Sequence, residues 1–538
     1  MGKLQDVNTT DIADAIRLAC GTMCRVLNAD DDNVPFFGSQ VYPDVFLENA
    51  SGLGDSHVPG RHLNALLNAE DAIGVVLDEE CVESHARAAF MSYSGPLAVP
   101  LSRERVDGKA KPGGRMGDFA AHHIREGFHA LAALVKYRAS EQARDVAEAS
   151  VAAILKYWDP LRGWHRKRIK DDTGLDVGSS EGEFTGDSGF ISGIARSMGP
   201  LVKYFRATGY GPALELAVRL KEKALDGFYP EDGSYHLDKL GSHTHSTTCV
   251  MSSLAQLADV TMDLGLLNRV KAFYDNGLWE IRDAIGWVLE IDREGYSPDH
   301  GEINNSGDIL ETALILGRWG HTECYADAER IVRGHILPSQ LRDIAFIEER
   351  PNPVGEDGRR DIARRHRGAF GFPAPYGHKP LESESISFNM DIVGGGVGSL
   401  CEAVRESTRF DEAGHWVNLL FDHETPYVNV ESPYTHPALT IRIKRPGALW
   451  IRVPTGVDPA DVRIFGAEGA EVDACATNGY LLLSRPPVNR PLTVQFTLPD
   501  STITLKHRSR DIRAHLTGDA VVAMENFGAD LTFFDPID

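Results

Sequence analysis

The sequence has few cysteines, and they form no regular pattern. The seven stand at positions 20, 24, 81, 249, 324, 401 and 475 of 538 residues, with no Cys-x-x-Cys motif. An odd, scattered set of thiols is typical of a reducing compartment. Cys20 and Cys24 lie four apart on an expected helix, which fits core packing better than a metal site. We therefore expect a cytoplasmic protein without a disulfide framework.

Excess positive charge and long apolar runs are also missing. The chain has 55 Lys and Arg against 78 Asp and Glu, a formal net charge of -23. Such a field repels polyanions, so nucleic acid is not an expected partner. No window approaches the ~20 apolar residues of a membrane span, and no basic region followed by an apolar run opens the chain. We expect neither a membrane partner nor a secretion signal.

Helical hairpins recur between residues 118 and 340. Ile124, Phe128, Leu131 and Val135 fall on one face of a helix, and 146–157 supplies its partner. Further pairs follow at intervals of about 50–60 residues: 190–207 with 212–225, 247–264 with 266–276, and 306–318 with 325–336. This repetition predicts an array or toroid of helical hairpins. Polar, Gly-rich connections precede several of the first helices, so polar residues gather at one mouth of the toroid, a natural ligand site.

The composition changes near residue 410. A Pro-, Gly- and Arg-rich loop at 350–380 precedes a last helix at 397–406, and short alternating segments follow. The expected strands are 416–421, 427–430, 439–444, 448–453, 462–465, 480–484 and 492–498. They predict an all-β sandwich, with a hairpin formed by 439–444 and 448–453. We therefore divide the chain into an N-terminal segment (1–50), a helical domain (51–410) and a β-sandwich region (411–538).

Four motifs in this order resemble glycoside hydrolase family 127, the β-L-arabinofuranosidase type. They are HIREG at 123–127, GSHTHSTT at 241–248, the helix pair that opens with GEINNSGD at 301–330, and VNLLFDHETPYVNVESPY at 417–434. The resemblance implies an (α/α)6 barrel followed by an all-β sandwich, a multidomain protein of helical and β parts. It also implies a carbohydrate as partner, while the sandwich offers a surface for a homodimer.

The chain departs from that family at its zinc site. Family members hold zinc with a glutamate and cysteines, one of which is also the nucleophile. Glu302 takes the place of the liganding glutamate, but Asn304 stands where a cysteine is expected, and the sequence DIVGGGVG replaces a cysteine pair near residue 393. Cys401 lies further along that helix as a core residue. A sulfur-rich zinc site is therefore excluded, and we expect no metal and no cofactor. The scaffold and sugar recognition carry over, but the chemistry does not carry over automatically.

Carboxylates are the candidates for catalysis once the thiolates are gone. Glycoside hydrolysis uses one acid to protonate the leaving oxygen and a second to attack or to activate water. The acidic stretch 285–315 supplies Glu302, which matches an active-site position of the family. Glu290 in the same stretch is the candidate general acid, and Glu294 and Asp292 are the alternatives to it. Glu181 and Glu183 are second-line acids in a polar loop. The competing interpretations are a solvated acidic loop and, for Glu302, a carboxylate that stabilises a helix N-terminus.

Histidines, an arginine, an amide and a tryptophan are the candidates for binding substrate. Arg61 and His57 precede or open a helix and are suited to a carboxylate, and an aromatic ring can stack on a sugar face. The expected set is His57, Arg61, His123, His243, His245, Asn304 and Trp287. Helix-cap roles for the histidines and a core role for the tryptophan are the alternatives.

Three functions stay open at this point. The first is a cytoplasmic, exo-acting glycoside hydrolase that uses carboxylates on a small oligosaccharide or glycoside. The second is a lyase or isomerase, in which a histidine or tyrosine abstracts the proton α to a uronate carboxyl and Arg61 or Arg125 neutralises the acid. The third is a sugar-binding protein that has lost its catalytic cysteines.

Overall fold

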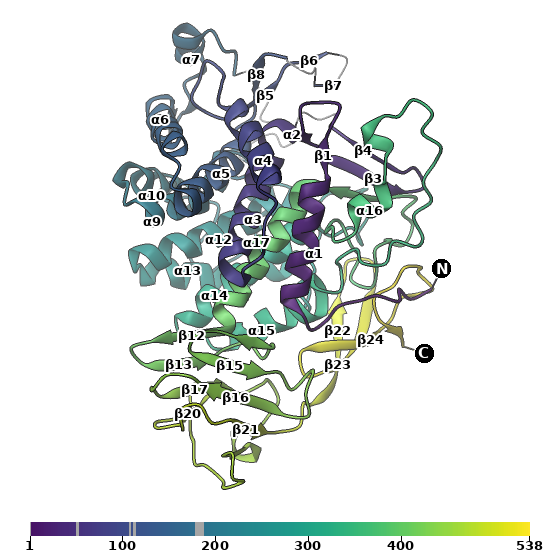
Figure 1. Ribbon diagram of the computed structural model, residues 1–538. Helices are drawn as coiled ribbons and strands as arrows, with labels where there is room; N and C mark the ends of the chain where they lie inside the picture. The colour runs from purple at the N-terminus through teal and green to yellow at the C-terminus, as the bar shows by residue number, and fades with distance from the viewer. Residues whose placement is uncertain (1, 50–52, 107–108, 111–113, 178–187, 538) are drawn as a thin grey trace.

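The computed structural model describes residues 2–49, 53–106, 109–110, 114–177 and 188–537. A helical region occupies the first three quarters of the chain, and β-sheets follow it (Figure 1). The two ends of the chain lie side by side, because Leu4 N donates to Thr532 O at 2.9 Å. No helix among the described residues is long and apolar enough to cross a membrane.

Six helices form a closed inner ring in chain order. Each contacts the next, and the last returns to the first. They bury residues on nearly all faces, because neighbours and an outer layer enclose them. Their bounds are α3 (Val58–Ile73), α5 (His123–Arg138), α9 (Met198–Thr208), α12 (Thr244–Thr261), α14 (Ile303–Arg318) and α17 (Met390–Ser407).

An outer helix packs against each part of this ring. The outer helices bury a single apolar stripe, as α6 does with Ala143, Ala147, Val151 and Ile154. Their bounds are α1 (Ile12–Arg25), α4 (Glu79–Ser92), α6 (Glu141–Tyr157), α10 (Gly211–Leu225), α13 (Leu264–Asp275) and α15 (Glu323–Ile331). The four expected hairpins are confirmed as the pairs α5–α6, α9–α10, α12–α13 and α14–α15. The expected helix at 190–207 is broken, since α8 (Ser188–Ser192) ends before Gly193 and α9 begins at Met198.

Two glycines let inner helices approach closely at one end of the ring. A Cβ on Gly60 of α3 would lie 1.8 Å from Glu126 O of α5. A Cβ on Gly394 of α17 would lie 2.7 Å from the backbone of Arg61 on α3. Only a residue without a Cβ fits such contacts. The polar residues at the starts of these helices are thereby drawn toward the axis of the ring.

Two five-stranded sheets form a sandwich after the ring. One has the order β12-β13-β17-β20-β19 and the other β14-β15-β16-β21-β18, and their inward residues build a separate core. The bounds are β12 (Thr408–Asp411), β13 (Gly414–Val417), β14 (His423–Glu424), β15 (Val428–Glu431), β16 (Leu439–Ile443), β17 (Leu449–Arg452), β18 (Arg463–Phe465), β19 (Cys475–Thr477), β20 (Tyr480–Leu483) and β21 (Leu492–Gln495). Six of the seven expected strands are present with shifts of up to three residues at their ends, whereas the one expected at 416–421 ends at Val417.

The expected hairpin between 439–444 and 448–453 is wrong. Strand β16 pairs with β15 and β21, whereas β17 pairs with β13 and β20, so the two lie in opposite sheets. Both strands carry an apolar face, Leu439 and Ile441 on one and Leu449 and Ile451 on the other. The connection arches from sheet to sheet, which lets both faces fill the same core.

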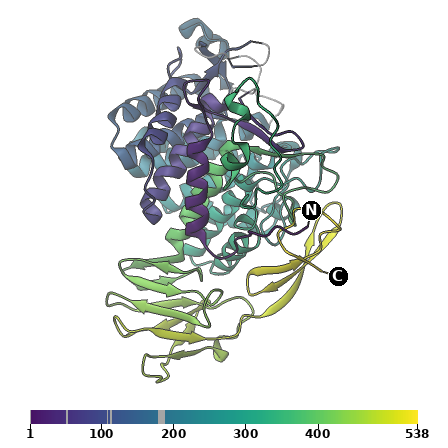
Figure 2. The same cartoon turned by 45° about the vertical axis from the view of Figure 1, so that its right-hand side comes forward.

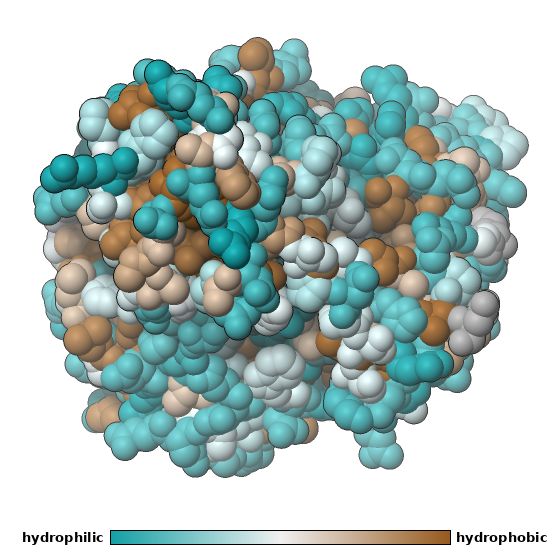
Figure 3. Space-filling view, turned by 90° about the horizontal axis from the view of Figure 1, so that it is seen from below, coloured by the Kyte–Doolittle hydropathy of each residue, from teal (hydrophilic) through white to brown (hydrophobic). Residues whose placement is uncertain are grey.

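A separate four-stranded sheet ends the chain. It comprises β22 (Asp500–Lys506), β23 (Asp511–Thr517), β24 (Ala520–Met524) and β25 (Asp535–Pro536). Its buried residues, such as Leu505 and Ile512, belong to the core of the helical region and not to that of the sandwich. Figure 2 shows this sheet beside the helices and apart from the sandwich. Seen from below, hydrophilic side chains cover most of the surface, and hydrophobic ones gather on the left part (Figure 3).

One disulfide joins two outer helices. Cys24 of α1 and Cys81 of α4 are bonded, with their Cα atoms 5.3 Å apart. Cys20, Cys249, Cys324 and Cys401 are buried free thiols, and Cys475 is exposed. The sequence indicated no disulfide framework and did not predict this single bond. The separation of the two cysteines by 57 residues hides the pairing from any local motif.

Candidate active site

The N-terminal ends of the inner helices bring polar side chains together on the ring axis. His57 and Glu302 are the N-cap residues of α3 and α14, and His245 and Asp391 lie in the first turns of α12 and α17. Glu126 lies in the first turn of α5. Helix N-termini carry partial positive charge, so converging starts favour carboxylates and anionic groups.

The Asn304 amide bridges two carboxyl groups. Its Nδ2 donates to Glu302 Oε1 at 2.7 Å and to Asp391 Oδ2 at 3.3 Å. All three side chains are buried. Gly395 of α17 makes room for the amide, because a Cβ there would lie 1.8 Å from Asn304 Oδ1. The close packing of α14 and α17 beside α3 therefore depends on a glycine at this position.

The two bridged carboxyl groups have opposite pKa shifts. Burial, followed by the charges of Glu290 and Asp391, raises the pKa of Glu302 from 4.5 to about 8. Burial also opposes ionisation of Asp391, but the hydrogen bond and charge of His57 and the charge of Arg61 outweigh it and lower the pKa of that carboxyl. At neutral pH Glu302 is therefore a protonated acid beside an ionised Asp391. Environments that separate two pKa values in this way assign the acid and the base.

His57 lies between two ionised carboxylates. Its Nε2 is 3.3 Å from Asp391 Oδ2, and its Nδ1 is 3.5 Å from Glu126 Oε2. Glu126 in turn faces three guanidinium groups, since Arg61, Arg125 and Arg196 approach its Oε1 to 3.5, 3.3 and 3.6 Å. Burial works against this charge, yet His57 and the arginines hold the pKa of Glu126 well below its usual range.

Three arginines also surround the ring of His245. Arg61 Nη2 and Arg125 Nη1 lie 3.2 and 3.4 Å from its Nε2, and a guanidinium can only donate. Arg196 Nη2 lies 3.5 Å from the other ring nitrogen, Nδ1, which also faces Glu302 Oε1 at 3.3 Å. Burial and the adjacent arginines lower the pKa of His245 well below its ordinary value, so the ring is neutral. His245 therefore contacts Glu302 as a neutral ring and helps to position its carboxyl group.

The sulfur-rich zinc site implied by the family resemblance does not fit these residues. Asn304 and Asp391 occupy the bridging positions, and Cys401 lies buried further along α17. Cys249 is one turn beyond His245, where burial raises the pKa of its thiol. Among the described residues, two groups have ligand atoms within 4.8 Å of one another: His57 with His122 and His123, and His243 with His245 and Glu302. In each group a histidine is already held by charged neighbours, which a metal would have to displace.

The other predicted acids lie further out. Glu290 is partly exposed and bonds His300 Nδ1 through its Oε2 at 2.6 Å. It is close enough to raise the pKa of Glu302. Glu294 is exposed on the loop that follows, and the structure does not bring it to Glu302. Asp292 binds Arg508 and Tyr235. Glu181 and Glu183 lie outside the described residues.

The remaining predicted binding residues divide into two kinds. His123 is buried and bonds Ser56 Oγ at 2.6 Å, while His243 is half-buried, bonds Ser246 Oγ at 2.7 Å and lies beside His245. Trp287 is a packing residue, because its Nε1 donates to Pro373 O at 2.9 Å and its ring contacts His507.

Sequence reasoning missed three residues of this site. Glu126 stands inside the HIREG motif, whose histidine drew attention instead. Asp391 opens the stretch DIVGGGVG, which looked like an apolar replacement for cysteines. Arg196 lies in a short helical turn between α8 and α9 and carries no local signal.

The comparisons with known proteins identify the fold. No protein-family model and no curated protein sequence matches the chain. A solved GH127 β-arabinofuranosidase matches with a TM-score of 0.57 and 13% identity, covering 96% of this chain and 83% of its own. A GH127 β-L-arabinofuranosidase from Geobacillus stearothermophilus T6 matches with a TM-score of 0.52 and 12% identity, covering 95% and 80%. By structure, the chain resembles the GH127 β-L-arabinofuranosidases and related (α/α)6 glycoside hydrolases at low sequence identity.

Proposed function

We propose that the chain is a glycoside hydrolase that acts on a small oligosaccharide or glycoside with two carboxyl groups and without a zinc-bound cysteine. The observation that carries the proposal is the Asn304 bridge between a protonated Glu302 and an ionised Asp391. The fold, which solved glycoside hydrolases share, supports it.

In this mechanism Glu302 gives its proton to the glycosidic oxygen as the bond to the anomeric carbon breaks. Asp391 provides the negative charge that attacks the anomeric carbon or takes a proton from water. Asn304 and His245 orient the Glu302 carboxyl, and both face its Oε1. Glu290 keeps the pKa of Glu302 high through its charge. Of the acids first expected to act, Glu302 takes the general-acid role that the sequence had suggested for Glu290, Glu290 raises the pKa of Glu302, and Glu294 has no role.

The test begins with a panel of aryl furanosides, pyranosides and uronic-acid glycosides, followed by hydrolysis in 18O-labelled water. We expect Glu302→Gln to lower kcat on a substrate with a poor leaving group by about 10²- to 10⁴-fold, and much less on a dinitrophenyl glycoside, which needs no acid. Asp391→Ala should lose activity on both kinds of substrate, and added azide should restore turnover. Glu294→Gln is the matched control and should keep full activity. Full activity of both Glu302→Gln and Asp391→Asn would refute the proposal.

A uronate lyase is the second candidate, and the observation that favours it is the cluster of Arg61, Arg125 and Arg196 beneath the site. Eliminative cleavage gives an unsaturated product that absorbs in the near ultraviolet and incorporates no solvent oxygen. Hydrolysis gives labelled sugar without that absorbance. A protein that binds sugars from the panel but turns over none would support the degenerate, sugar-binding alternative.

A further inference from the structure

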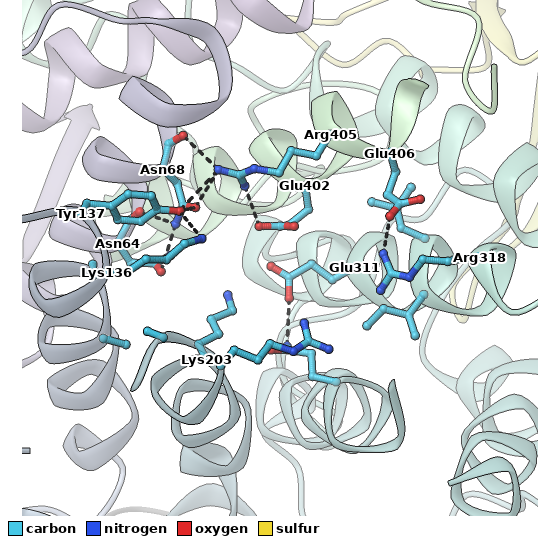
Figure 4. A pocket seen from close by; sticks show the side chains of 17 residues that line it. Asn64, Asn68, Lys136, Tyr137, Lys203, Glu311, Arg318, Glu402, Arg405 and Glu406 are labelled. Carbon is cyan, nitrogen blue, oxygen red and sulfur yellow. Dashed lines mark hydrogen bonds and ion pairs between the residues drawn. The ribbon is translucent and has the colours of Figure 1, made fainter. Parts of the chain in front are cut away.

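A cavity of about 220 Å³ lies at the other end of the helix ring. Its walls come from the C-terminal halves of the inner helices, whereas Glu302 and Asp391 lie at their N-terminal ends. Figure 4 shows its polar side chains converging from several helices on one open space. The residues that bear on its ligand are Asn64, Lys136, Lys203, Gln256 and Glu311.

The arginines around this cavity are already paired. Arg206 and Arg318 both contact Asp259, and Arg318 also binds Glu406. Arg405 binds Asp71 at 2.8 Å and Glu402 at 2.9 Å. Guanidinium groups held by carboxylates in this way have little remaining capacity for an anionic ligand. They form the walls of the cavity and are not its binding groups.

Two lysines and one glutamate remain. Lys136 Nζ donates to Tyr137 OH at 2.7 Å, and Lys203 extends into the open space (Figure 4). Within the described part of the chain, neither ammonium lies within ion-pair distance of a carboxylate. Glu311 Oε2 accepts from Ser252 and Gln256, which are neutral. Lys203 therefore presents to the cavity an ammonium group that no described carboxylate pairs with, beside the hydrogen-bonding amides of Gln256 and Asn64.

We propose that this cavity binds a sugar acid, a single sugar ring that carries one carboxylate. The carboxylate would pair with Lys203, while Glu311, Gln256 and Asn64 bind hydroxyl groups as acceptor and donors. Ala132, Ala133, Leu314 and Ile315 line the same space and suit the C–H face of a ring. The size fits, because an engineered protein cavity of about 150 Å³ holds benzene. The inference goes beyond the proposed hydrolase and does not rest on it.

The cavity is separate from the candidate active site. Between them lies a void of about 20 Å³, lined by Lys203, Gln256 and Glu311 on one side and by Asn304 and Asp308 on the other. That space has room for water but not for a sugar. Asn304, Asp308 and Glu311 follow one face of α14, so the two sites share a helix. Burial and then the charge of Glu311 raise the pKa of Asp308, despite the opposing charge of Arg125, which gives the sites an electrostatic link.

Titration calorimetry with D-glucuronate and D-glucose tests the inference, since the two probes share a ring and differ in the carboxylate. We expect glucuronate to bind the full-length protein about tenfold more tightly than glucose, the size of one charge-assisted hydrogen bond. Lys203→Met should remove that difference in affinity, and Glu311→Gln should weaken the binding of both probes. Lys170→Met, an exposed lysine on α7 (Arg166–Thr173), is the matched control and should change neither.

The active-site variant Glu302→Gln distinguishes the two ends of the ring, because binding in the cavity should survive it. Ala207→Leu enlarges a side chain that lines the cavity without removing a polar group, and should abolish binding with an unchanged Tm. Equal affinity for the two probes, no binding of either, or loss of binding only in Glu302→Gln would overturn the inference. Inactivity on every glycoside would refute the proposed function alone and leave this result intact.

Discussion

The protonation of Glu302 gives the sharpest test of the candidate site. Burial and two neighbouring carboxylates raise its pKa from 4.5 to about 8. One pKa unit corresponds to about 1.4 kcal/mol, so the shift amounts to about 5 kcal/mol between the two protonation states. The folded protein keeps a proton that the unfolded chain releases above pH 4.5. The free energy of unfolding therefore falls as the pH rises from about 4.5 to 8, and the full stabilisation is present only below that window.

Two measurements follow from this shift. For an active glycosidase, kcat/KM should fall on the alkaline side with a midpoint near pH 8, because Glu302 must be protonated to act. Glu290→Gln removes a negative neighbour and should move that midpoint toward neutral pH. Glu302→Gln should also remove most of the alkaline loss of stability, measured by urea unfolding at pH 5 and pH 8.

The control is Glu294→Gln, an exposed acid on the same stretch of chain as Glu290. Its alkaline midpoint should equal that of the wild type. A midpoint that Glu290→Gln leaves unmoved would refute the electrostatic reasoning, and so would an identical pH dependence of stability in Glu302→Gln and the wild type. Either result would assign the raised pKa to another group.

Three further predictions concern packing. Gly395→Ala should lower the free energy of unfolding by about 1–3 kcal/mol and activity at least tenfold, because its Cβ displaces the Asn304 amide from its two buried carboxyl partners; thermal denaturation and kinetics measure the two effects. Reduction of the Cys24–Cys81 bond should lower the free energy of unfolding by about 4 kcal/mol for its 57-residue span; thiol titration giving seven free groups would instead support the expected cytoplasmic location. Trp287→Phe should cost about 1–2 kcal/mol through the lost bond to Pro373 O and leave the activity of the folded protein unchanged, whereas a raised KM would restore the sugar-stacking role.

The local periodicity of apolar residues was enough to predict most of the helical part of the fold. The 3.6-residue pattern predicted α5 and α6 and the three pairs after them, because each inner helix and its outer partner are joined by a short connection. The alternation of apolar and polar residues predicted strands β16 and β17, but it could not show that the two strands belong to different sheets. Alternation reports that one face of a strand is buried, but not which sheet supplies the other half of the core.

The candidate site was predicted only where its residues cluster in sequence. Glu302 and Asn304 stand two apart and were found, but Asp391 lies 87 residues beyond Asn304 and was missed. The charge at the centre comes from Glu126 and Arg196, which belong to two other elements. Only closure of the ring puts these helix starts side by side, so no spacing in the sequence encodes their contact.

Asn304→Asp tests whether activity requires the amide bridge between Glu302 and Asp391, because the change is isosteric and removes only the hydrogen-bond donor. Three carboxyl groups would then converge in a buried space where the amide now donates to two of them. We expect activity to be lost and the free energy of unfolding to drop by several kcal/mol at pH 8, with much of the loss recovered at pH 5, where protons replace the amide donor. Asn305→Asp is the matched control on the same turn of α14, since Asn305 accepts from the Thr248 hydroxyl and donates to the Thr244 hydroxyl, and so bridges no pair of carboxyl groups. Equal pH dependence in the two variants would show that Asn304 packs beside Glu302 and Asp391 without linking their protonation.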